Sequence, residues 1–141
     1  MNHFVVQAKL PSLNQYINAC RLNKFAGAKF KRDTEKIIED AIDIYLDHEQ
    51  LHSVDEPVKI RFDWHEKTMR RDADNVASAK KYILDAMQTK NILPNDNRQY
   101  VKGFYDDIID DDENYVLVEI KPIKDISEDN NKIYPGIIWL K

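Results

Sequence analysis

One segment limits the possible folds of this chain more than any other. Within residues 57–65 an apolar side chain recurs at every second position, and these side chains are Val58, Ile60, Phe62 and Trp64. This spacing places all four on one face of a half-buried β-strand. The segments 33–50 and 75–90 instead have the 3.6-residue periodicity of amphipathic helices. Their predicted apolar faces are Ile37, Ile38, Ala41, Ile42 and Tyr45 in the first and Val76, Ala79, Ile83, Ala86 and Met87 in the second. The chain is therefore expected to pack helices against a sheet.

Further strands are predicted on both sides of this centre. Residues 3–10 alternate and end at Pro11, whereas residues 11–16 are rich in turn-forming side chains and are expected to be a loop. Residues 98–105 and 114–121 flank an acid-rich connection and are expected to be two more strands. The order β-α-β-α-β-β predicts an α/β (α+β) domain with a small mixed sheet and two main helices.

The composition is typical of one soluble globular domain. Apolar residues make up 43% of the 141 residues and charged residues 33%. We expect one domain over residues 1–122 and a tail over 123–141 that packs on the domain or on a partner subunit. Cys20 is the single cysteine, which excludes an internal disulfide. No signal peptide or membrane-spanning run is recognisable, so a cytoplasmic location is expected.

The net charge of −4 conceals an uneven distribution of charge along the chain. Residues 1–36 carry seven Lys or Arg against two acids, a balance of +5, and the remainder has a balance of −9. A basic face formed by residues 21–36 and 67–81 could bind a polyanion such as DNA. The alternative is that these lysines and arginines form an ordinary solvated surface.

A zinc-peptidase motif lies at the predicted end of the first helix, as His48-Glu49-Gln50-Leu51-His52. On a helix this spacing places two imidazoles on one face to bind zinc, with the glutamate as general base. Here the motif is at the end of an amphipathic helix and has no clear third ligand. Histidines near a helix C-terminus also interact favourably with the helix dipole. A zinc peptidase is therefore a minor alternative.

A second candidate site comprises three carboxylates and two arginines. These residues are Asp72, Asp74, Asp96, Arg70 and Arg71. In an extended segment the first two carboxylates point to one side, and the loop after Pro94 could return the third to them. Converging carboxylates hold a hard cation such as Mg²⁺, and adjacent arginines suit phosphates, although no EF-hand pattern is present. The alternative is that Asp74 or Asn75 caps the following helix.

The motifs around these acids resemble the RusA family of Holliday-junction resolvases. They are Arg71-Asp72-Ala73-Asp74-Asn75-Val76, Lys81-Tyr82-Ile83-Leu84-Asp85-Ala86 and Ile92-Leu93-Pro94-Asn95-Asp96. The segment Pro11-Ser12-Leu13-Asn14-Gln15-Tyr16 and the basic residues after it are also similar to the opening of many members. The resemblance covers about residues 4–121 and makes helix capping the minor interpretation of the acids.

The resemblance implies a small homodimeric α/β enzyme that resolves four-way DNA junctions by paired symmetric nicks and requires Mg²⁺. Its metal ligands would be Asp72, Asp74 and Asp96. The catalytic lysine of the family falls on Lys81 or on Ser78, depending on which aspartate the spacing is counted from. Residues expected to bind the DNA backbone are Asn14, Arg21, Lys24, Lys29, Lys31, Arg70 and Arg71. A catalytically inactive junction-binding protein is the other alternative.

Overall fold

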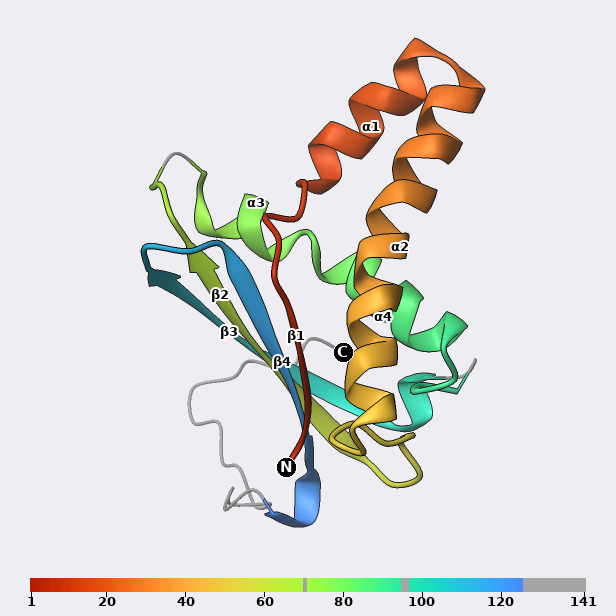
Figure 1. Ribbon diagram of the computed structural model, residues 1–141, viewed down its shortest axis with the longest axis vertical. Coiled ribbons are helices and arrows are strands. Elements are labelled where there is room, and N and C mark those ends of the chain that lie inside the picture. The colour runs from red at the N-terminus through yellow and green to blue at the C-terminus, as the bar shows by residue number, and fades with distance from the viewer. Residues whose placement is uncertain (70, 95–96, 126–141) are drawn as a thin grey trace, which may run out of the picture.

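The computed structural model describes residues 1–69, 71–94 and 97–125 (Figure 1). The elements are β1 (Asn2–Val6), α1 (Leu13–Leu22), α2 (Lys24–Asp47), β2 (Val58–Glu66), α3 (Ala73–Ala77), α4 (Lys80–Thr89), the 3-10 turn η1 (Asn97–Gln99), β3 (Val101–Asp110), β4 (Tyr115–Pro122) and the 3-10 turn η2 (Ile123–Asp125). No helix within the described ranges is long and apolar enough to cross a membrane. Most of the predicted tail, from residue 126 onward, lies outside the described residues.

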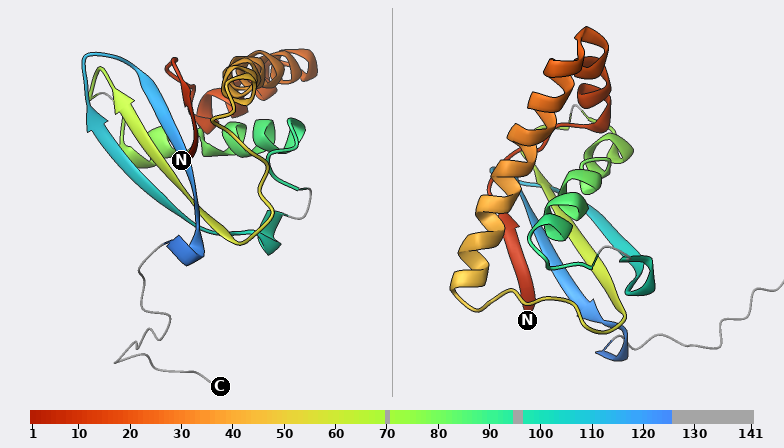
Figure 2. Two further views of the ribbon diagram at one scale, coloured as in Figure 1. Left: turned by 60° about the horizontal axis from the view of Figure 1, so that its bottom comes forward. Right: turned by 90° about the vertical axis from the view of Figure 1, so that its right-hand side faces the viewer.

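The four strands form one mixed sheet in the order β1-β4-β2-β3. The strands β2 and β3 are parallel, and α3 and α4 form the crossover between them. The strand β4 lies antiparallel to both β1 and β2. All four helices lie on one face of the sheet (Figures 1 and 2). The predicted α+β class with a small mixed sheet is thus confirmed.

The hydrophobic core lies between this sheet and the helices. The four alternating side chains of β2 point into it, and none is more than 4% exposed. They pack in one cluster with buried residues of the helices, namely Ile38 and Ile42 of α2 and Tyr82, Ile83, Ala86 and Met87 of α4. The apolar faces predicted for both helical segments are therefore those that the fold buries, except that Ile37 is 49% exposed.

The helical layer begins earlier than the sequence periodicity predicts. Residues 11–16, predicted to be a loop, include the start of α1 at Leu13. The helix predicted over 33–50 begins nine residues earlier than expected, at Lys24. Ser12 caps α1: its hydroxyl accepts a hydrogen bond from Gln15 N, and its own backbone N–H donates to Gln15 Oε1. This reciprocal capping box satisfies two backbone donors at the helix start. The turn-forming residues therefore mark a helix start.

The second predicted helix, over residues 75–90, is divided into α3 and α4. At the division Ser78 Oγ donates to the backbone oxygen of Asn75 at 2.7 Å and accepts from Leu13 N at 3.0 Å. The backbone of Ala79 bonds three residues back, to Val76, rather than four. The break between α3 and α4 thus coincides with a tertiary contact, the hydrogen bond from Leu13 at the start of α1 to the Ser78 hydroxyl. The prediction of one continuous helix is wrong at this point.

Candidate functional site

The two aspartates of the Arg71-Asp72-Ala73-Asp74-Asn75 motif lie where the loop after β2 enters α3. Asp72 is the N-cap residue, with φ −66° and ψ 156°, and Asp74 is in the first helical turn. The prediction that both aspartates lie in an extended segment is therefore wrong at Asp74, because α3 begins at Ala73. Both side chains are exposed. Neither carboxylate forms a hydrogen bond or an ion pair with another described residue. The fold therefore presents two acidic groups to solvent without neutralising them from the described part of the chain.

Helix capping does not explain these acids. Asp72 occupies the cap position, but its side chain makes no capping hydrogen bond. The side chain of Asn75 is used elsewhere, since its Oδ1 accepts from Asn14 Nδ2 at 3.4 Å. The capping interpretation, which placed the cap at Asp74 or Asn75, is therefore wrong.

Two further members of the predicted site, Arg70 and Asp96, lie outside the described residues. The described residues that flank 95–96 lie at the opposite end of α4 from Asp72 and Asp74 (Figures 1 and 2). Within residues 1–69, 71–94 and 97–125, no group of three or more His, Cys, Asp or Glu side chains is arranged to hold a metal ion. The convergence of three carboxylates stays a prediction.

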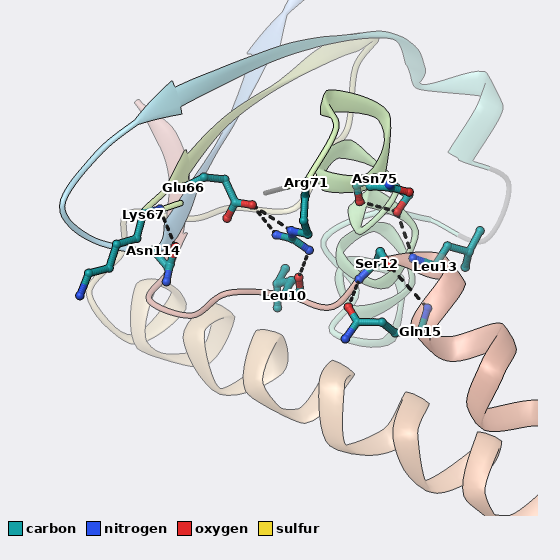
Figure 3. Close-up of polar contacts among 10 residues, drawn as sticks. Leu10, Ser12, Leu13, Gln15, Glu66, Lys67, Arg71, Asn75 and Asn114 are labelled. Carbon is teal, nitrogen blue, oxygen red and sulfur yellow. Dashed lines mark hydrogen bonds and ion pairs between the residues drawn. The ribbon is translucent and has the colours of Figure 1, made fainter. Parts of the chain in front are cut away.

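Arg71 fixes the loop that carries Asp72. Its Nε and Nη2 donate to Glu66 Oε1 at 3.0 and 2.6 Å, and its Nη1 donates to the backbone oxygen of Leu10 at 2.9 Å (Figure 3). The side chains of Arg71 and Glu66 are only 17% and 8% exposed. The guanidinium, which the sequence predicted to contact a DNA phosphate, is thus used inside the protein. It joins the end of β2, the segment after β1 and the start of α3.

A second set of hydrogen bonds fixes the end of α3 and the start of α4 against the start of α1. The backbone N–H of Leu13 donates to Ser78 Oγ at 3.0 Å, and the Tyr82 hydroxyl donates to the backbone oxygen of Ser12 at 3.1 Å (Figure 3 shows Ser12 and Leu13). Burial raises the pKa of Tyr82 to about 12, so this hydroxyl keeps its proton. Ser78, one of the two positions considered for the catalytic lysine, thus uses its hydroxyl to bind the start of α1.

Lys81, the other position, lies on the exposed side of α4. Its Nζ is 3.4 Å from both carboxylate oxygens of Asp85, which Lys31 also approaches at 3.6 Å. Lys31 is in addition 3.8 Å from Glu35. Burial raises the pKa of Glu35, and the charge of Lys31 opposes this shift. Asp85 is thus paired with two lysines, and Lys31 lies between two carboxylates.

The remaining residues predicted to bind DNA lie on the helical hairpin formed by α1 and α2. Arg21 and Lys24 are exposed and form no ion pair with a described residue, whereas Lys29 pairs with Asp33. Asn14, at the start of α1, contacts Asn75 beside Asp74. The hairpin therefore begins next to the two exposed carboxylates and carries unpaired positive charge away from them.

The zinc-peptidase motif is not arranged as a zinc site. The helix α2 ends at Asp47, so His48 is its C-cap and His52 lies in the loop beyond it. Glu49 has a positive φ of 57°, which interrupts any helical continuation. His48 Nδ1 instead lies 2.8 Å from the backbone oxygen of Ile44. The two imidazoles therefore do not lie on one helix face, and the arrangement that the zinc-peptidase motif requires is absent from this segment.

Glu66 is the site residue that the sequence analysis missed. It continues the two-residue alternation of β2 beyond Trp64, so a strict extension of that pattern places a carboxylate at a buried position. A buried carboxylate must pair with a cation, and Arg70 and Arg71 follow four and five residues later in the sequence. The alternation thus contained a signal for the Arg71–Glu66 pair.

Comparison with models of known protein families gives no match to this chain, and no curated protein matches its sequence. The candidate site is therefore defined by the contacts described above and by the motifs in residues 71–96.

Proposed function

We propose that this chain is a Mg²⁺-dependent endonuclease that resolves four-way DNA junctions, as the resemblance to the RusA family implies. The observation that carries the proposal is the pair of exposed carboxylates, Asp72 and Asp74, which lack a cationic partner among the described residues. Two acids this close in sequence repel each other when both are ionised. A divalent cation with oxygen ligands would relieve that repulsion.

The way in which the pair is held also favours this function. The Arg71–Glu66 ion pair and the bond from Arg71 to Leu10 fix the loop on one side of Asp72. The bond from Leu13 to Ser78 fixes α3 on the other side. A metal or catalytic site gains affinity and rate when its groups are held by a rigid second layer of contacts.

The proposed chemistry is hydrolysis of a phosphodiester. A bound Mg²⁺ would supply an activated water and neutralise negative charge on the phosphate. Asp72 and Asp74 would bind the cation, with Asp96 as the third ligand that the resemblance implies, and Lys81 would stabilise the leaving oxygen. In each nick a water oxygen bonds to phosphorus and the bond from phosphorus to O3′ breaks. The O3′ leaves with a proton, so the ends can be ligated.

The proposed assembly is a homodimer. A four-way junction has two-fold symmetry, and paired nicks on opposing strands require two active sites related by the same axis. Phosphate contacts from Arg21 and Lys24 would hold the arms without reading their sequence. A junction-binding protein without nuclease activity, the alternative, would use the same basic surface but would not need the cation.

The test is a cleavage assay on a synthetic four-way junction labelled in turn on each strand. The expected result is paired symmetric nicks with Mg²⁺, none with EDTA, and little cutting of a linear duplex of the same sequence. Sedimentation of the protein with and without junction is expected to show a dimer. Tight junction binding without cleavage at any Mg²⁺ concentration would favour the inactive alternative. Absence of both binding and cleavage would reject the proposed function.

A further inference from the structure

The turn between α1 and α2 presents two large apolar side chains to solvent. The helices are joined by a single residue, Asn23, and we call residues 21–25 the apex of the hairpin. Leu22 and Phe25 at this apex are 78% and 82% exposed. The apex projects from the body at the end far from the sheet (Figure 1, and the right-hand view of Figure 2). Two such side chains together on a projecting tip are candidates for a binding contact.

The apex is rigid as well as exposed. Asn23 is in an extended conformation and caps α2 through a 2.8 Å hydrogen bond from Ala26 N to its Oδ1. Four residues into α2, Gly27 is buried against α1, where a Cβ atom would lie only 2.6 Å from Cys20 Sγ and 3.1 Å from Cys20 Cα. The two helices therefore meet at close range. A rigid support lowers the entropic cost of binding through Leu22 and Phe25.

The charge around the apex indicates which partner it fits. Residues 1–32 contain six Lys or Arg and no Asp or Glu. Arg21 and Lys24 flank the apolar pair, and Arg32 shares a face of α2 with Phe25 because it is seven residues further on. None of these three cations forms an ion pair with a described residue. A second copy of the chain would bring like charges together here, whereas a polyanion would neutralise them.

We propose that the apex is a wedge for branched DNA, in which Arg21 and Lys24 bind phosphates while Leu22 and Phe25 contact base-pair faces at the branch point. This inference rests on the proposed function. Apolar side chains that enter DNA must unstack bases, and this costs least where stacking is already interrupted, as it is at a branch. The helix α1 is about 15 Å long and runs from the apex to α3. With the apex at the branch point, the carboxylates of α3 would lie roughly four nucleotides away along a strand.

The experiment measures binding rather than cleavage, in buffer with EDTA. The probes are a four-way junction with 2-aminopurine beside the branch point and a linear duplex of the same sequence. The double variant Leu22→Ala/Phe25→Ala is compared with the parent chain. Ile44→Ala is the matched control, since Ile44 is also exposed, at 57%, and lies about 28 Å further along α2.

The parent protein is expected to raise the 2-aminopurine fluorescence on binding the junction. The double variant is expected to abolish that rise and to weaken junction binding about tenfold or more, with duplex binding changed less than about twofold. The control is expected to behave as the parent. In Arg21→Gln/Lys24→Gln the plot of log K against log salt is expected to become less steep, its negative slope shrinking in magnitude by about 1.8 for both DNAs. The reason is that two phosphate contacts are lost.

Equal junction affinity and an equal fluorescence rise in the double variant would overturn the wedge while leaving the proposed function intact. Absence of any DNA binding by the parent at low salt would reject both. Sedimentation showing that the double variant dissociates a dimer would assign the apex to a second copy. Loss of parent binding to phosphatidylserine vesicles in the double variant would assign it to a membrane surface. Either of these results also overturns the wedge.

Discussion

The fold treats four aspartates in or directly after β2 and β3 differently from the two aspartates of α3. Each of the four accepts a hydrogen bond from a basic or aromatic donor. These pairs are Asp106 with Lys80 and Trp64, Asp63 and Asp107 with Arg61, and Asp111 with His65. At the start of α3, Asp72 and Asp74 have no such partner among the described residues. Carboxylates of the first kind serve stability, and those of the second are available to a cation from solution.

The largest expected effect is on activity and comes from the α3 pair. Asp72→Asn or Asp74→Asn removes a charge that the proposed Mg²⁺ site requires, so junction cleavage at saturating Mg²⁺ is expected to fall about a hundredfold or more. Mg²⁺ is expected to raise the Tm of the parent and to raise the Tm of either variant less. Initial cleavage rates and melting curves with and without Mg²⁺ measure both effects.

The matched control for these variants is Asp107→Asn, an exposed aspartate of the sheet that pairs with Arg61. Its cleavage rate is expected to stay within about twofold of the parent, because exposed ion pairs contribute little. Near-normal cleavage in Asp74→Asn would end the metal assignment. An equal loss in Asp107→Asn would instead remove the distinction between the two sets of acids.

The next effect is on stability and comes from the buried support of the α3 loop. Glu66→Gln leaves the Arg71 guanidinium without its charged partner, and removing one member of a buried pair costs about 3 kcal/mol. Urea unfolding of Glu66→Gln measures this loss. The control is Asp33→Asn, which breaks the exposed pair with Lys29 and is expected to cost about 0.5 kcal/mol or less. Equal costs in the two variants would show that the Arg71–Glu66 pair does not anchor the loop.

A smaller effect is expected at Asp106, whose side chain is 27% exposed. Asp106→Asn keeps an acceptor for the Trp64 indole but loses the charge that faces Lys80. The expected cost is about 1 kcal/mol, and a double-mutant cycle with Lys80→Met is expected to assign most of it to this pair. A coupling energy indistinguishable from zero would mean that Lys80 is held by the rings of Phe62 and Phe104 instead.

The smallest effect concerns pH. The hydrogen bond from His65 lowers the pKa of Asp111 below its ordinary value, and the backbone N–H of Asp112 adds to the shift. An aspartate with a lowered folded-state pKa contributes stability above its unfolded-state pKa of about 3.9 and loses that contribution as the pH falls. The Tm difference between the parent and Asp111→Asn is therefore expected to shrink as the pH falls below about 4. A difference independent of pH would contradict the assignment.

Much of the fold could be predicted from periodicity alone. The alternation around Phe62 and the apolar stripe around Ile83 identified the elements that meet in the core, because burial of one face imposes those periods. The start of α1 was missed although Ser12 and Gln15 form a readable capping box, since proline and asparagine in the same segment favour a turn. The break at Ser78 had no local signal, because it coincides with a contact to Leu13, distant in sequence.

The candidate site could be predicted in its residue types but not in its arrangement. The motif around Asp72 identified the exposed carboxylates, because Asp–x–Asp spacing is local. The direction of the Arg71 side chain could not be predicted, since an arginine beside acids is equally suited to a phosphate or to a buried partner such as Glu66. That choice depends on where β2 ends relative to the loop, which is a property of the folded sheet.

The contacts that hold α3 and the start of α4 also determine when in folding the site can form. Leu13 bonds to Ser78, Ser12 to Tyr82 and Leu10 to Arg71 across sequence separations of 65, 70 and 61 residues. Contacts this distant close large loops, so they form slowly and late compared with the turns of a helix. During synthesis the N-terminal hairpin emerges long before its partners. The nascent chain therefore carries its positive charge well before it can assemble the carboxylates beside it.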